Sequence, residues 1–233
     1  MRGDAKPLVK MLQGAETRFV IPVYQRNYDW KREQCARLFD DLEEVVEEGR
    51  SSHFFGSIVS KADMERRVLI DGQQRVTTVF ILLAALVKQT EEGNIASAGP
   101  KKTADRIRRE WLIDEYDEVE KLKLKLVKGD QEAFKKVIDG DADNLVEGSN
   151  VTENYRYLLE RIGATDLTSE ELREAVKALT VIDIRLEGDD NARASTRRAS
   201  RSPRVTRSAT TSSWTFPRQT KMPITVSTGT PSS

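Results

Sequence analysis

The chain has 233 residues, of which 33% are charged and 38% hydrophobic, a composition typical of a protein that buries a core. It has no apolar stretch long enough to span a bilayer and no N-terminal signal sequence, so we expect a cytoplasmic protein without membrane contact. A single cysteine, Cys35, excludes an intramolecular disulfide, and the single histidine, His53, argues against a structural zinc site and a two-histidine nuclease site.

Charge is distributed unevenly along the chain. The 38 basic and 38 acidic side chains cancel, but residues 191–233 contain eight basic and no acidic residues, which leaves a net charge of −8 in residues 1–190. Residues 191–233 are also rich in Ser and Thr and cannot bury enough apolar surface to offset their chain entropy. We therefore expect an acidic folded body over 1–190 and a basic, disordered tail over 191–233.

Short strands and helices alternate in the first half of the chain. The β-branched residues of 18–23 predict a strand, and apolar residues at helical spacing after Asp29 predict an amphipathic helix. Two further strands are expected at 53–60 and 66–70. The second of them leads through a short turn into an apolar helix over 76–88, which we expect to be the buried central helix.

Helices dominate the second half. A loop is expected over 90–102 and a helix over 103–116. The alternation of 121–127 predicts a half-buried strand whose three lysines point outward. The remaining predicted elements are helices over 130–138, 151–162 and 168–179 and a final strand over 181–186. Together these elements predict a mixed α/β body.

The strongest local signal is the segment Asp71-Gly72-Gln73-Gln74-Arg75, between a strand and a helix. Gly72 permits a tight turn, and the free amides of a helix N-terminus bind anions such as phosphate. Arg75 would add a bidentate donor, and Asp71 could hold a metal ion or orient a water. The alternative is an ordinary Asp-Gly turn followed by a surface arginine.

A second cluster, residues 22–30, combines two tyrosines, a tryptophan, an arginine and two amides. Such side chains can stack on and hydrogen-bond to a nucleobase or a nucleic acid. The alternative is a loop whose aromatic side chains pack beneath the core.

Three segments in this order, FVIPVYQRNYDW, HFFGSIV and VLIDGQQRVTT, resemble the DUF262 family over residues 8–190. This family is the N-terminal domain of GmrSD-type, modification-dependent restriction endonucleases. The resemblance implies an α+β fold similar to the ParB and sulfiredoxin group, a nucleotide-binding module with additional helices. It also implies binding and hydrolysis of a nucleoside triphosphate with Mg²⁺.

The resemblance and the chemistry of the side chains together give each candidate residue an expected role. Asp71, Gln74 and Arg75 are expected to be catalytic, with Asp71 also holding the metal ion and Gln74 orienting the attacking water. The expected nucleotide-binding residues are Gly72, Gln73, Arg75, Tyr24, Gln25 and Arg26. The expected nucleic-acid contacts are Arg26, Tyr28 and Trp30.

The expected partners are a nucleotide, modified or unmodified DNA, and a DUF1524-type nuclease of the His-Asn-His class. The nuclease is expected as a partner because this chain has no nuclease site of its own. A reading-frame shift after Ala192 would explain the abrupt change in composition, and a genuine basic arm is the alternative. Two other functions stay open: a nucleotide-gated DNA sensor without turnover, and an inactive truncated product.

Overall fold

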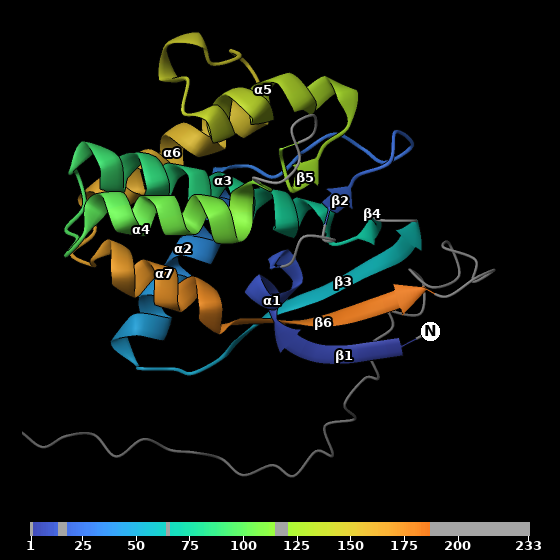
Figure 1. The fold of residues 1–233 in the computed structure, drawn as a ribbon, viewed down its shortest axis with the longest axis horizontal. Coiled ribbons are helices and arrows are strands. Elements are labelled where there is room, and N and C mark those ends of the chain that lie inside the picture. The colour runs from blue at the N-terminus through green and yellow to red at the C-terminus, as the bar shows by residue number, and fades with distance from the viewer. Residues whose placement is uncertain (1, 14–17, 64–65, 115–120, 187–233) are drawn as a thin grey trace, which may run out of the picture. The chain divides into compact units, whose positions relative to one another are not determined.

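The computed structural model describes residues 2–13, 18–63, 66–114 and 121–186 (Figure 1). The described strands are β1 (Arg2–Pro7), β2 (Arg18–Val20), β3 (His53–Asp63), β4 (Arg66–Asp71), β5 (Leu124–Lys125) and β6 (Leu179–Leu186). The described α-helices are α1 (Leu8–Leu12), α2 (Arg32–Glu47), α3 (Gln73–Glu92), α4 (Pro100–Ile107), α5 (Lys128–Asp139), α6 (Asn150–Ala164) and α7 (Ser169–Ala178). A π-helix, η1 (Arg108–Leu112), and a 3₁₀ helix, η2 (Ala142–Asn144), complete this part of the chain. The expected disorder and frame shift after residue 190 lie outside the described residues.

The strands form one six-stranded sheet in the order β1-β6-β3-β4-β2-β5. β3 pairs parallel with β6 and antiparallel with β4, while β2 pairs parallel with both β4 and β5. β1 closes the other edge antiparallel to β6. The fold is therefore α/β, built around a mixed sheet. None of the described helices is long and apolar enough to cross a bilayer.

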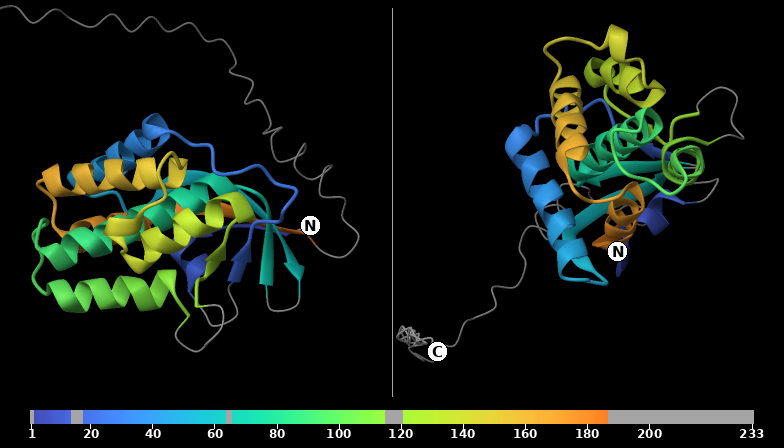
Figure 2. Two further views of the ribbon diagram at one scale, coloured as in Figure 1. Left: turned by 90° about the horizontal axis from the view of Figure 1, so that it is seen from above. Right: turned by 90° about the vertical axis from the view of Figure 1, so that its left-hand side faces the viewer.

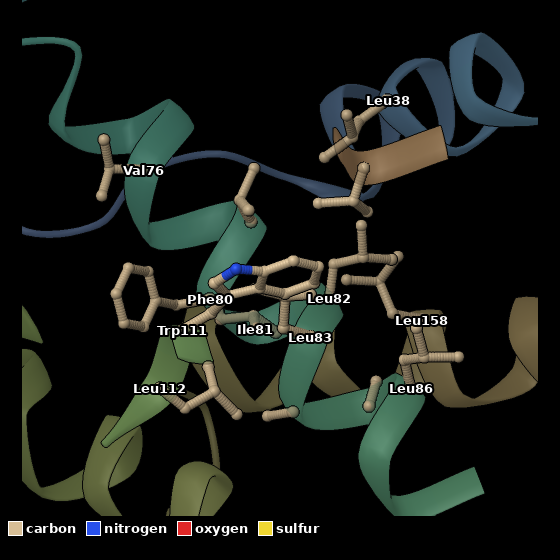
Figure 3. Packing of buried hydrophobic residues seen from close by; sticks show 14 of the residues in the cluster. Leu38, Val76, Phe80, Ile81, Leu82, Leu83, Leu86, Trp111, Leu112 and Leu158 are labelled. Carbon is tan, nitrogen blue, oxygen red and sulfur yellow. The ribbon is translucent and has the colours of Figure 1, made fainter. Parts of the chain in front are cut away.

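Helix α3 is the central helix, as its composition predicts. It contacts α4, α5, α6 and η1, and Figures 1 and 2 show it surrounded by these helices next to the sheet. Its apolar side chains pack against Trp111 and Leu112 of η1 and against Leu158 of α6 (Figure 3). An apolar surface on all sides of α3 is stable here because neighbouring elements exclude water from every side.

The structure corrects several element boundaries. α3 begins at Gln73 and ends at Glu92, so it is longer at both ends than the predicted 76–88. The predicted helix over 103–116 begins earlier, at Pro100, and changes into η1 at Arg108. β1 and α1 were not predicted, because the polar residues of β1 show no alternating pattern.

The predicted outward orientation of Lys123 is wrong. β5 has only two residues, and Lys123 lies just before it, 6% exposed. Its Nζ donates hydrogen bonds to the carbonyl oxygens of Leu12 (3.1 Å) and Glu110 (2.8 Å). These carbonyls replace water around the ammonium group, and burial lowers the pKa of Lys123. The alternation of lysine and leucine therefore did not predict correctly whether Lys123 is exposed to solvent.

Candidate functional site

A left-handed turn at Gly72 joins β4 to α3. The residue has a φ of 86°, and a Cβ at this position would lie 2.9 Å from the carbonyl oxygen of Ser57 on β3. Both the backbone conformation and the close approach to β3 require glycine. The turn places Asp71 at the end of the strand and Arg75 in the first turn of the helix.

The N-terminus of α3 presents free backbone amides at this turn. The first intrahelical hydrogen bond is donated by Val76 N to Gly72 O (3.1 Å), so the amides of residues 73–75 have no partner within the helix. Asp71 lies beside them, and its Oδ1 accepts a hydrogen bond from Gly72 N (2.8 Å). The amides and the helix dipole favour an anion, while Asp71 favours a cation.

Arg75 lies against the backbone of β3. A Cβ on Gly56 would be only 2.9 Å from Nε of Arg75, so this glycine leaves the space that the guanidinium occupies. Within the described residues, Arg75 forms no ion pair or hydrogen bond. Its donors therefore remain available to a ligand, and a residue of the HFFGSIV segment makes room for it.

The side chain of Gln74 points away from this turn and holds the backbone of residues 27–30. Its Oε1 accepts hydrogen bonds from Asp29 N (2.8 Å) and Trp30 N (3.2 Å), and its Nε2 donates to Asn27 O (3.1 Å). Gln73 is also buried, and its Nε2 donates to Arg26 O (3.4 Å). The two glutamines thus join the first turn of α3 to the loop before α2.

Helix α6 holds the same loop from another side. Asn150 donates to Tyr28 O (3.0 Å), and Asn154, one turn later, donates to Trp30 O (2.8 Å) and to the hydroxyl of Tyr28 (3.0 Å). Asp130 of α5 accepts a hydrogen bond from Tyr28 N (2.6 Å), and burial raises the pKa of this carboxyl. No local sequence pattern indicated these three residues, because they are distant from the loop in the chain.

A pocket of about 330 Å³ opens at the N-terminus of α3. This volume lies at the lower end of the range for small-molecule sites. Gln25 closes one side, with its Nε2 donating to Ile70 O (3.0 Å). Arg26 is two-thirds exposed and forms a long ion pair with Asp29 (3.7 Å). The residues that line the pocket are Gln25, Arg26, Trp30, Ile70, Asp71, Gly72, Gln73, Gln74 and Arg75.

Most of the expected site residues therefore meet at one place, but three of them differ from expectation. Tyr28 is 5% exposed, and its hydroxyl bonds to Thr78 Oγ1 (2.7 Å) in the core, so it offers no surface to a nucleic acid. Gln74 Oε1 already accepts two hydrogen bonds from the loop, so it has no lone pair left to accept one from an attacking water. Tyr24 is 71% exposed and is not among the residues that line the pocket.

Comparison with protein families gives a match over residues 8–219, to the GmrSD restriction endonuclease, N-terminal domain. The match continues beyond residue 190, where the sequence predicts the end of the domain. Among curated proteins, none matches this chain. The three segments that carry the resemblance all contribute to the site, through Gln25, Gly56 and Arg75. Because the family match covers most of its length, the chain belongs to the family of GmrSD restriction endonuclease N-terminal domains.

Proposed function

We propose that this chain is the nucleoside triphosphate-binding and hydrolysing regulatory domain of a cytoplasmic DNA restriction system. The observation that carries the proposal is the placement of Asp71, Arg75 and the free amides of α3 around one pocket. A partner domain or subunit of the DUF1524 type would supply the nuclease.

The phosphates would bind at the N-terminus of α3. The amides of residues 73–75 and the guanidinium of Arg75 would provide the donors, since these residues line the same pocket. Arg26 lines the same pocket and provides a second cation, since its ion pair with Asp29 is long and exposed. Trp30 also lines the pocket and offers an aromatic surface for the base.

The residues present fit a magnesium ion that comes with the nucleotide. Within the described residues there is no group of three or more His, Cys, Asp or Glu side chains that could hold a metal alone. Mg²⁺ is often held by one carboxylate together with substrate phosphates, and Asp71 has lone pairs left for this role. The ion would neutralise phosphate charge. In hydrolysis, Asp71 would orient the water that attacks the γ-phosphorus as the bond to the β-phosphate oxygen breaks.

A second candidate is a nucleotide-gated sensor that binds without turnover. The hydrogen bonds of Gln74 favour the sensor, because the side-chain amide that was expected to orient the water instead binds the backbone of residues 27–30. Release of inorganic phosphate distinguishes the two functions, since both predict binding and only the first predicts turnover.

The test is calorimetric titration of the full chain with ATP, GTP, CTP and UTP in the presence of Mg²⁺, together with a phosphate-release assay. Arg75→Ala should weaken binding by about 10- to 100-fold, the usual effect of losing a hydrogen bond to a charged group. Arg37→Ala removes the same charge from an exposed position on α2 and should leave binding unchanged. Equal effects of the two substitutions, or no binding by folded wild-type protein, would refute the proposal.

A further inference from the structure

Basic residues are concentrated on the outer side of α4 and η1. Four side chains, Lys101, Lys102, Arg106 and Arg109, are exposed, and we call them the α4–η1 basic surface. The opposite side of the same segment is buried and apolar, with Ala104, Ile107 and Trp111 in the core. This surface is basic although residues 1–190 carry a net charge of −8.

The neighbouring acidic residues form ion pairs, and one of these pairs includes Arg106 of the basic surface itself. Glu110 forms ion pairs with both Arg106 (2.7 Å) and Arg173 (3.0 Å). Glu91 of α3 pairs with Arg108, which lies between the basic surface and α3. Within the described residues, Lys101 and Lys102 form no ion pair or hydrogen bond. Asp105 is a second acidic neighbour, so within the described residues the four basic side chains of the surface lie beside two carboxylates, those of Asp105 and Glu110.

The segment 26–32, expected from the sequence to contact DNA, is less suitable. Arg26 lines the proposed nucleotide pocket, and Lys31 Nζ donates to Asn150 Oδ1 (2.7 Å). The guanidinium of Arg32 lies over the ring of Tyr157, 4.5 Å from its centroid. The following helix, α2, has six acidic and two basic residues, which repel a polyanion.

Two cations from neighbouring elements contact η1, the helix that carries Arg109. Lys123 binds the carbonyl of Glu110 from inside, and the guanidinium of Arg173 lies 5.3 Å from the ring centroid of the buried Trp111. π-Helices are rare and are frequently found at functional sites. Residues 102–109 span about 10 Å along the helix axis, a length comparable with several phosphate charges of duplex DNA.

We propose that the α4–η1 basic surface binds the phosphate backbone of duplex DNA. The proposal rests on the proposed function in one respect, that DNA is the polymer on which the restriction system acts. Lysine and arginine contacts to phosphates are independent of base sequence. The surface would therefore hold DNA against the domain, and reading of a sequence or a modification would be left to other parts of the system.

The test is fluorescence anisotropy with a labelled 30-base-pair duplex and the full chain, from 25 to 200 mM salt. Lys101→Ala combined with Lys102→Ala should weaken binding by about tenfold at low salt and lower the slope of log K against log salt by about 2. The control is Lys128→Ala combined with Lys135→Ala, which removes two exposed lysines from α5 and gives the same net charge. The basic residues of 191–233 are present in all three proteins. Differences in DNA affinity among the proteins therefore come from the substituted lysines on α4 or α5.

Unchanged affinity and slope in the α4 double variant, equal losses in the control, or no binding by wild type at 25 mM salt would each overturn the proposal. Nucleotide titration of the same proteins separates it from the proposed function. If nucleotide binding is absent while the α4 double variant alone loses DNA, the basic surface stands and the nucleotide site fails.

Discussion

The segment Asp71–Arg75 has two parts that face different surroundings. Gln73 and Gln74 point into the protein and bind the backbone of residues 26–30. Asp71 and Arg75 lie at the pocket, where Arg75 has no partner within the described residues. The five residues therefore combine a structural pair with a pair that is available to a ligand.

This difference suggests how binding could be connected to the rest of the fold. The glutamines join the first turn of α3 to the loop that carries Arg26 and Trp30, and Asn150 and Asn154 join the same loop to α6. A ligand at the pocket would contact both sides of this junction. The inward side chains should therefore affect stability, and the outward ones should affect binding.

The largest effect on stability is expected from Gln74→Ala. The substitution removes three hydrogen bonds and leaves the backbone groups of Asn27, Asp29 and Trp30 without their partner. We expect a loss of about 3 kcal/mol in the free energy of unfolding, measured by urea denaturation. Arg75→Ala is the matched outward variant and should change stability by less than about 0.5 kcal/mol. Similar losses of stability in the two variants would contradict the distinction between inward structural side chains and outward binding side chains in the segment Asp71–Arg75.

An intermediate effect is expected from Gly72→Ala. Alanine is strained at a φ of 86°, and its Cβ would approach the backbone oxygen of Ser57 to 2.9 Å. We expect a loss of about 2 kcal/mol in the free energy of unfolding, again measured by urea denaturation. Gly49→Ala is a useful control, since that residue has a similar φ of 62° but a Cβ there would meet nothing within 4 Å. If the two variants lose the same stability, the approach to β3 contributes nothing.

The smallest effect, and of opposite sign, is expected from Asp130→Asn. Burial raises the folded-state pKa of Asp130 above its usual value, so the charged form costs stability at neutral pH. Asparagine keeps an acceptor for Tyr28 N without the charge, and the variant should be more stable by less than about 1 kcal/mol at pH 7. The difference should shrink as the pH falls through the folded-state pKa towards about 4, where the wild-type carboxyl takes up a proton. A difference that stays constant with pH, in melting curves of both proteins, would rule out this cause.

The sequence predicts local features of the site better than its tertiary contacts. The strand, turn and helix around Gly72 follow from apolar periodicity and from the conformational freedom of glycine. The resemblance, in turn, selected the segments that meet at the pocket. Neither could show that Gln74 points inward, because its partners lie 44 to 47 residues away in the chain.

The same limit explains the other differences. Tyr28 looks like a stacking residue in sequence, but Thr78 and Asn154 satisfy its hydroxyl inside the core. Lys123 looks exposed, but carbonyls from two other elements bind its ammonium group. Polar side chains with distant partners were thus the ones that local patterns misplaced.

The most direct test of the nucleotide site is hydrogen exchange of the backbone amides of residues 72–75, with and without nucleotide and Mg²⁺. These amides lie at the start of α3, and those of 73–75 have no partner within the helix, so they should exchange rapidly in the free protein. Phosphates bound at this helix N-terminus should slow their exchange strongly, and Arg75→Ala should need about 10- to 100-fold more nucleotide for the same protection. Protection elsewhere on the domain, with unchanged exchange at 72–75, would contradict the assignment of the pocket.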